Sequence, residues 1–359
     1  MSLAHDLAVK AKGFTHPNPA VGAVVVKNGD IIGNGATAAA GGPHAEKTAL
    51  AMAGSRAAGA TLYVTLEPCC HFGRTAPCTD AIINAGIKEV IVSVRDPNPL
   101  VAGKGINRLR RRGISVKTGL LHNEAAALNE DFFWAITRKR TFITLKLALT
   151  LDGRISDTAG DSKWITSTAL REVVHQLRST HAAVAVGSGT LAADNPQLTV
   201  RTGRNTHPGR IIFTSTPETI PKKSWFFLHA RENRSIAVVR KRSRQHIATD
   251  PATGLEYWYT GSADRRQSMI NFTEMAFFQN LTSVFVEGGQ QIASTLLEGG
   301  LVNRLYLFFG NRIVGKGKNG ILFRSGLPIA ESIRLADRKN ILIGDDVYVT
   351  GIPDNVRSG

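Results

Sequence analysis

Cysteine is scarce in this chain, with 3 in 359 residues. So few thiols cannot build the disulfide framework of a small secreted domain, which leaves them available for other chemistry. Long apolar runs are missing as well, since no segment approaches the about 18 residues that cross a bilayer. The first six residues lack a basic segment followed by an apolar core, so we expect no signal peptide, no membrane association and a cytoplasmic location.

Acidic residues are few relative to basic ones, at 28 against 44, and the net charge is +16. Such a surplus favours anionic partners, either nucleic acid or phosphorylated small molecules. The basic residues recur in short groups at 108–112, 138–140 and 240–244 instead of forming one tail. Solvated surface accounts for most of them, and contacts to a phosphate need only a few.

Two of the cysteines lie in a pattern typical of a zinc site. His44, Cys69 and Cys78 offer one nitrogen and two sulfur donors, which suit Zn²⁺ and leave a fourth position for water. Glu46 stands two residues after the histidine and is free to move protons. Nucleobase deaminases combine these residue types as H-x-E with P-C-x-x-C. Here eight residues separate the two cysteines, where that signature has two.

Alternating strand-like and helix-like segments predict an α/β fold in both halves. Residues 1–120 predict a partly parallel sheet covered on both faces, with the zinc ligands at the ends of helices and strands. An amphipathic helix is expected over 124–139, and the pattern restarts with a strand at 141–149. We therefore predict domains at 1–140 and 141–359, the second ending with a strand over 341–350.

Two glycine-rich segments of the second half are candidate phosphate sites. Residues 187–192 imitate the Rossmann fingerprint, which requires a helix starting at the turn. We reject that interpretation because Asp-Asn-Pro at 194–196 breaks the chain a few residues later. Glu-Gly-Gly at 287–289 fits better, since a strand there ends in glycines that open a helix over 290–297.

Longer motifs run through nearly the whole chain. They are Thr-His-Pro-Asn-Pro-Ala-Val-Gly at 15–22, Pro-His-Ala-Glu at 43–46, Glu-Pro-Cys-Cys-His-Phe-Gly-Arg-Thr-Ala-Pro-Cys at 67–78, Ser-Lys-Trp-Ile-Thr at 162–166 and Asp-Asn-Pro-Gln-Leu-Thr-Val-Arg at 194–201. Together they resemble the bifunctional deaminase–reductases of riboflavin biosynthesis, which share the eight-residue gap. Ala76 and Thr214 stand where that family usually has proline and aspartate, and residues 37–39 lack a usual histidine.

The resemblance implies two consecutive reactions. Zinc-activated hydroxide, with Glu46 as catalytic proton carrier, deaminates 2,5-diamino-6-ribosylamino-4(3H)-pyrimidinone 5′-phosphate. NADPH then reduces the ribosyl group to give 5-amino-6-(5-phosphoribitylamino)uracil. The implied folds are a cytidine-deaminase-like three-layer α/β/α domain and a dihydrofolate-reductase-like α/β domain. We expect a homo-oligomer that binds phosphorylated pyrimidines and no nucleic acid.

The resemblance also assigns residues to the sites. Those expected to line NADPH are Ala148, Trp164, Thr190, Asp194, Ser215, Gly289, Gln290, Gln291, Ile292, Ala293, Ser294 and Thr295. Those expected to contact substrate are Asn18 in the first half and Ser162, Arg178, Leu198, Arg201 and Glu287 in the second. Arginine suits the phosphate, because its planar fork matches phosphate oxygens.

Other interpretations stay open at this point. A tRNA or nucleic-acid deaminase with an accessory domain is favoured by the net charge and predicts salt-sensitive binding. A nucleic-acid-binding scaffold with an inactive zinc fold, or a reductase whose first half is only structural, is a further alternative. A closed structural zinc site needs a fourth protein ligand, for which Cys70 and His71 are the candidates.

Overall fold

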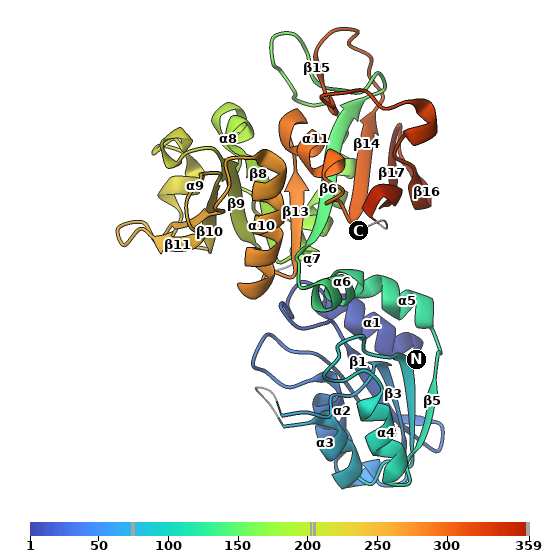
Figure 1. Ribbon diagram of the computed structural model, residues 1–359. Coiled ribbons are helices and arrows are strands. Elements are labelled where there is room, and N and C mark those ends of the chain that lie inside the picture. Colours follow the sequence, from blue (N-terminus) through green and yellow to red (C-terminus); the bar gives the residue numbers. More distant parts are fainter. Residues whose placement is uncertain (73–75, 202, 204–205, 357–359) are drawn as a thin grey trace. The chain divides into compact units, whose positions relative to one another are not determined.

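The chain forms two compact units, Met1–Arg140 and Thr141–Gly359 (Figure 1). The computed structural model describes residues 1–72, 76–201, 203 and 206–356. Residues 73–75 of the cysteine motif therefore lie outside the described part. Among the described residues, no helix combines the length and apolar character needed to cross a membrane.

The first unit is a three-layer α/β/α structure built on five strands. Their order is β2 (Asp30–Ala36), β1 (Gly22–Lys27), β3 (Thr61–Leu66), β4 (Glu89–Val94) and β5 (Ser115–Thr118), with β3, β4 and β5 parallel and β1 antiparallel to β2 and β3. Helices α1 (Ser2–Ala11) and α5 (His122–Leu128) cover one face, and α2 (Ala45–Ala53), α3 (Cys78–Asn84) and α4 (Lys104–Arg111) cover the other. This confirms the predicted fold class of the first half.

Glycines allow two of these helices to lie very close to the sheet. A Cβ atom on Gly22 of β1 would lie 1.9 Å from the carbonyl oxygen of Ala4 in α1. On β2, a Cβ on Gly33 would lie 2.2 Å from the carbonyl oxygen of Ala49 in α2. Any side chain at either position would push the helix outward, and α2 carries part of the site described below.

The predicted helix over 124–139 is wrong as one element. The structure has α5 and a separate helix, α6 (Glu130–Arg138), with Asn129 between them. The buried Asn129 amide accepts a hydrogen bond from the Ala20 N–H and donates one to the Ala20 carbonyl, both at 2.9 Å. Periodicity could not reveal the interruption, because this asparagine bonds to a backbone segment that is distant in the sequence.

The second unit is built on a ten-stranded sheet with helices on both faces. The strand order is β11 (His246–Thr249), β12 (Glu256–Tyr259), β10 (Ser235–Val239), β9 (Gly209–Thr214), β8 (Ala183–Gly187), β13 (Ser283–Glu287), β6 (Phe142–Thr150), β14 (Arg304–Gly310), β17 (Asp346–Pro353) and β16 (Leu335–Ile343). The strands from β12 to β14 are parallel, so their carboxyl ends lie along one edge. Short strands β7 (Arg154–Ser156) and β15 (Lys318–Asn319) pair separately.

Two apolar cores lie on the two faces of this sheet. Helices α10 (Arg265–Phe278) and α11 (Gln290–Glu298) pack on one face through residues such as Phe272 and Leu296. Helices α7 (Thr168–Thr180) and α9 (Trp225–Leu228) pack on the other through residues such as Leu170 and Phe226. Burial on both faces explains why the parallel strands read as continuous apolar runs in the sequence.

Of two local predictions in this unit, one is wrong and the other is confirmed. The strand predicted over 341–350 is a hairpin, in which Gly344 with φ of +59° turns the chain between β16 and β17. A helix, α8 (Ser188–Asp194), does begin directly after β8, as the Rossmann fingerprint requires. It ends after seven residues, where Asn195 adopts a left-handed conformation, so the predicted break at 194–196 is confirmed.

Candidate active sites

The three predicted zinc ligands converge at element ends in the first unit. His44 is the N-cap of α2, Cys69 follows β3, and Cys78 is the first residue of α3. The His44 Nδ1 atom lies 3.2 Å from the Cys78 sulfur and 3.6 Å from the Cys69 sulfur, and all three donor atoms lie within 4.8 Å of one another. Tetrahedral zinc with bonds of 2.0 to 2.3 Å places such donors roughly 3.5 to 3.8 Å apart, so the cluster fits zinc.

The cluster leaves a coordination position for a non-protein ligand. Within the described residues, the one group of metal-binding side chains contains these three and neither Cys70 nor His71. The residues that the structure does not describe, at 73–75, 202, 204–205 and 357–359, include no histidine, cysteine, aspartate or glutamate. Three protein ligands with one open position are typical of catalytic zinc and not of a closed structural site.

The electrostatics of the cluster favour a metal-binding thiolate. The pKa of the Cys69 thiol is lowered to about 4, first by a hydrogen bond from the Cys78 side chain and then by His44 and the Cys78 N–H, which lies 3.3 Å from the sulfur. The shared proton raises the pKa of Cys78. Because the thiolate is the form that binds metal, bound zinc would take the place of that proton.

Glu46 lies beside the cluster but outside the ligand set. It occupies the first turn of α2 and is 4% exposed. Burial, followed by the nearby Cys69 thiolate, raises the pKa of its carboxyl to about 7. A carboxyl with such a pKa can both accept and release a proton near neutral pH, which is the property required of a general acid–base residue.

A second carboxylate, which the sequence analysis did not single out, supports the cysteine loop. Glu67 is buried and accepts hydrogen bonds from the backbone N–H groups of Asp96 at 3.3 Å, Gly103 at 2.9 Å and Ile106 at 3.1 Å. These bonds attach the end of β3, and with it Cys69, to the start of α4. In the sequence, the one feature that could have pointed to Glu67 is its position as the first residue of the 67–78 motif.

Asn18, predicted to contact the pyrimidine, lies in the loop between α1 and β1. Its N–H donates to the Thr15 carbonyl at 2.8 Å, and the Thr15 hydroxyl donates to the Asn18 carbonyl at 3.0 Å. These bonds shape the turn, and the role of the side chain stays a prediction.

The predicted substrate contacts of the second unit line one pocket of about 590 Å³, which we call the substrate pocket. It lies at the carboxyl ends of β6, β8 and β13. All five predicted residues line it, namely Ser162, Arg178, Leu198, Arg201 and Glu287, together with Ala148, Trp164, Thr190, Asp194 and Gly289 from the cofactor set. Tertiary structure thus brings together residues that the resemblance assigned separately, while their individual roles stay predictions.

Charged side chains in this pocket are already partly paired. The Arg178 guanidinium donates to both carboxylate oxygens of Glu287 and to the Thr199 carbonyl at 2.9 Å. Burial alone would raise the pKa of Glu287, but Arg178 holds it below its ordinary value. Lys146 stands opposite Glu287 in the β6–β13 register, and burial lowers its pKa. Among the described residues, Arg201 donates to the uncharged Gln197 side chain at 2.7 Å and forms no ion pair, so its charge is the more available of the two arginines.

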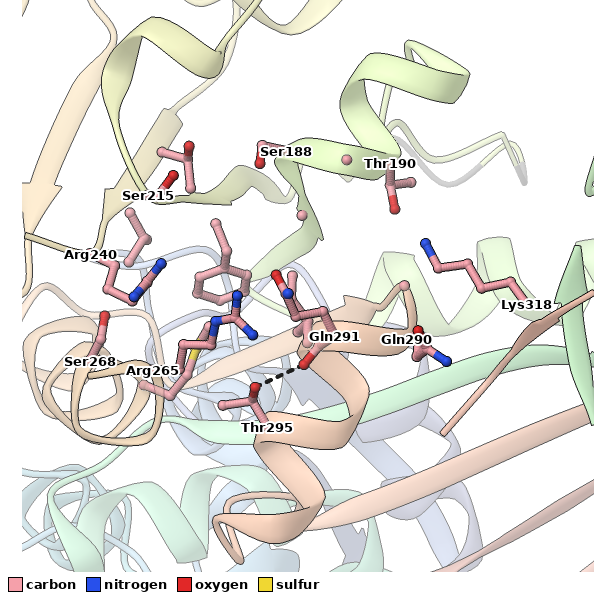
Figure 2. Close-up of a pocket in the computed structure, with 18 residues that line it drawn as sticks. Ser188, Thr190, Ser215, Arg240, Arg265, Ser268, Gln290, Gln291, Thr295 and Lys318 are labelled. Carbon is pink, nitrogen blue, oxygen red and sulfur yellow. Dashed lines mark hydrogen bonds between the residues drawn. The ribbon is translucent and has the colours of Figure 1, made fainter. Parts of the chain in front are cut away.

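A second pocket of about 350 Å³, which we call the β9–β10 pocket, adjoins the substrate pocket (Figure 2). The two share Thr190 and Gly289 as lining residues. From the predicted cofactor set it contains Thr190, Ser215, Gly289, Gln290, Gln291, Ile292 and Thr295. The glycine segment rejected as a Rossmann site also lines it, so the amino-terminal ends of both α8 and α11 face this space.

Two predicted cofactor residues do not reach either pocket. Ala293 is fully buried in the apolar core beneath α11. The Ser294 hydroxyl donates to the Gln290 carbonyl at 2.7 Å and accepts from the Leu322 N–H at 2.9 Å. A contiguous run along a helix cannot face one pocket throughout, because successive residues turn by about 100°.

The sequence analysis missed several polar residues of the β9–β10 pocket. These are Ser188, Arg240, Arg265, Ser268 and Lys318. Arg240 belongs to the basic group at 240–244, which was the only signal for it.

Comparison with known proteins decides the family. Residues 141–349 match the model of the RibD C-terminal domain, and residues 1–94 match the cytidine and deoxycytidylate deaminase zinc-binding region. The chain belongs to the RibD family.

RibD proteins resemble the chain over nearly its full length. The riboflavin biosynthesis protein RibD of Aquifex aeolicus is 44% identical over 352 residues, which cover 97% of this chain and 96% of that protein. RibD of Escherichia coli is 37% identical over 97% of this chain and 96% of its own length. A crystal structure of the deaminase/reductase from Thermotoga maritima matches with a TM-score of 0.84 and 37% identity, over 98% of this chain and 97% of that one. Acinetobacter baumannii RibD matches with a TM-score of 0.85 at 32% identity, with the same coverage of both chains.

Membership of the RibD family confirms the central predictions. The chain is a bifunctional enzyme of riboflavin biosynthesis that joins a zinc-dependent deaminase to an NADPH-dependent reductase. A nucleic-acid deaminase with an accessory domain is not favoured, because the second unit is itself the RibD C-terminal domain.

Proposed function

We propose that residues 1–140 deaminate 2,5-diamino-6-ribosylamino-4(3H)-pyrimidinone 5′-phosphate and that residues 141–359 reduce the ribosyl group of the product with NADPH. The Thermotoga maritima relative is named a diaminohydroxyphosphoribosylaminopyrimidine deaminase and 5-amino-6-(5-phosphoribosylamino)uracil reductase. The observation that carries the proposal is the three-donor cluster of His44, Cys69 and Cys78 with buried Glu46 beside it.

In the deaminase, the chain holds the metal and moves protons. Zinc, when bound to the three ligands, activates a water by lowering its pKa towards about 7. Glu46 accepts a proton from that water and delivers one to the leaving amine. Oxygen adds to the ring carbon, the carbon–nitrogen bond breaks, and ammonia leaves. Glu46 can exchange protons in this way because it is not held as a ligand.

In the reductase, the chain positions donor and acceptor. Arg201 binds the substrate phosphate, while Arg178 orients the Glu287 carboxylate towards the sugar hydroxyls. NADPH supplies the hydride when it is bound. Because the substrate pocket and the β9–β10 pocket meet at Thr190 and Gly289, the dinucleotide can extend from one into the other. Most of the rate enhancement in such a site comes from this alignment.

The proposal includes a homo-oligomer that does not bind nucleic acid. Strand β16 forms one edge of the ten-stranded sheet, and Leu342 on it is 78% exposed. Long exposed edge strands are commonly covered by another chain. Light scattering on the purified protein gives the subunit number. A filter-binding assay with tRNA at low salt tests whether the protein binds nucleic acid.

A paired assay tests the two activities separately. Ammonia release is measured on the diaminopyrimidine without NADPH, and NADPH oxidation is measured on the deaminated product, each with and without a zinc chelator. We expect the chelator to abolish ammonia release and to leave NADPH oxidation unchanged. Full ammonia release from protein without bound metal would overturn the proposed deaminase site.

A further inference from the structure

The β9–β10 pocket has two ends of different character. One end adjoins the substrate pocket through Thr190 and Gly289. The other end holds Arg240, Arg265 and Ser215, which Figure 2 shows on the side away from Thr190. Hydride transfer requires the nicotinamide to lie against the substrate. On the function proposed above, the adenosine half of the dinucleotide must therefore extend towards Arg240 and Arg265.

The strand order explains how these residues come together. Arg240 directly follows β10, Ser215 directly follows β9, and the two strands are parallel neighbours. The Arg240 N–H donates to the Thr214 carbonyl at 3.0 Å, and its guanidinium donates to the Ala263 carbonyl at 2.5 Å. The first of these bonds holds the two strand ends together, and the second fixes the guanidinium.

Arg265 enters the pocket from the start of α10. With the Gln291 amide turned so that its oxygen faces the arginine, that oxygen accepts from Nη1 at 2.9 Å and from Nη2 at 2.8 Å. An amide neutralises none of the positive charge, so this contact orients the guanidinium without satisfying it electrostatically.

The described lining of the β9–β10 pocket carries positive charge and no carboxylate. This lining includes three cations, the two arginines and Lys318, and no aspartate or glutamate. Among the described residues, none of the three cations forms an ion pair with a carboxylate. Arg240 is half-buried and Arg265 is exposed. Two guanidinium groups that line one pocket without a carboxylate partner favour a ligand that brings an anion.

We infer that Arg240 and Arg265 bind the 2′-phosphate of the adenosine ribose and thereby select NADPH over NADH. Dinucleotide sites that prefer NADH place a carboxylate near the ribose 2′-hydroxyl, whereas arginine accommodates the 2′-phosphate. Here β9 ends at Thr214 and Ser215 follows it, no carboxylate belongs to the described lining, and the Thr214 hydroxyl donates to the Thr216 carbonyl at 2.9 Å. A monoanionic or dianionic phosphate on the 2′-oxygen satisfies both arginines.

Fragment binding tests this inference without turnover. Adenosine 2′,5′-bisphosphate and adenosine 5′-monophosphate are titrated calorimetrically into the full-length protein, its Arg240→Gln and Arg265→Gln variants, and Arg242→Gln as control. Arg242 belongs to the same basic group but does not line the pocket. A charged hydrogen bond contributes about 1.5 to 3 kcal/mol, so each pocket variant should bind the bisphosphate roughly tenfold to a hundredfold more weakly.

The expected pattern is selective. Affinity for the monophosphate should stay within about twofold in every variant, which also shows that the pocket remains folded. Equal affinity of the unmodified protein for the two fragments would overturn the inference, as would equal loss of both fragments in the arginine variants. In kinetics, kcat/KM should fall for NADPH and stay constant for NADH. Failure to reduce the deaminated product, together with tighter binding of the bisphosphate than of the monophosphate, is a separate outcome. That result would overturn the proposed reductase reaction and leave the assignment of Arg240 and Arg265 to the 2′-phosphate standing.

Discussion

Replacing Glu46 by glutamine separates proton transfer from metal binding. The substitution keeps the shape of the side chain and removes its ability to exchange a proton. Glu46 is 4% exposed, and its carboxylate does not belong to the metal-binding group of the described residues. We therefore expect Glu46→Gln to retain one zinc per chain. Because burial already raises the pKa of this carboxyl to about 7, the site accepts an uncharged group without a large loss of stability.

The size of the effect follows from the role assigned to the residue. A positioned proton carrier contributes about 10²- to 10⁴-fold to a rate, which corresponds to roughly 3 to 5 kcal/mol of transition-state stabilisation. Glu46 is assigned both the acceptance and the delivery of the proton, so the loss should lie near the upper end. We expect ammonia release to fall about a thousandfold or more, while NADPH oxidation on the deaminated product stays at the level of the unmodified protein.

Three measurements on the same preparation decide the outcome. These are zinc content by mass spectrometry, ammonia release in the absence of NADPH, and NADPH absorbance on the deaminated product. Glu124→Gln is the matched control, since Glu124 also lies in the first turn of a helix in the first unit but is exposed. Ammonia release within tenfold of the unmodified protein, at full zinc content, would refute the role of Glu46. Parallel loss of both activities would refute independent sites.

Further variants probe the ligands and the substrate pocket. Cys69→Ser should lose both zinc and ammonia release, whereas Cys70→Ser should keep both; metal analysis measures the zinc and the ammonia assay the activity. Equal zinc loss in the two variants would contradict the three-ligand site. Arg201→Ala should weaken binding of the phosphorylated substrate by about 1 to 3 kcal/mol, and an unchanged KM would remove Arg201 from the site. Arg178→Leu should lower the free energy of unfolding by about 3 kcal/mol at pH 7, because the largely buried Glu287 carboxylate loses its bidentate partner. Arg178 lowers the pKa of Glu287, so this stabilisation is present above the ordinary carboxylate pKa and is lost as the pH falls through the lowered pKa. Urea unfolding at acidic pH should therefore show a smaller difference in stability between the variant and the unmodified protein than at pH 7.

Much of the secondary structure could be predicted, because apolar runs and turn residues within each segment determine it. The strand predicted at 141–149 and the helix predicted over 290–297 lie within one residue of the observed β6 and α11. The zinc ligands could be named because their chemistry is rare and their motifs are specific. The interruption at Asn129 and the hairpin at 343–346 could not be foreseen, because each depends on a partner or a turn that periodicity does not encode.

The second site shows the same division more sharply. Ser162, Arg178 and Glu287 were assigned by resemblance alone, and no spacing rule connects residues so far apart in the chain. Ala293 and Ser294 were included because the motif is contiguous, yet α11 turns them into the core and towards Leu322. Arg265 had no sequence signal, since a single arginine at a helix start is ordinary.

The amino-acid sequence by itself determined which donor atoms, carboxyls and guanidinium groups this enzyme has, because chemistry resides in side chains and the motifs preserve their order. Tertiary structure alone decided which of them meet. The order β10–β9–β8–β13–β6 places strand ends from distant parts of the chain along one edge, and the two pockets form where those ends adjoin. That order is set by burial on both faces of the sheet, a property of the whole second unit and not of any motif within it.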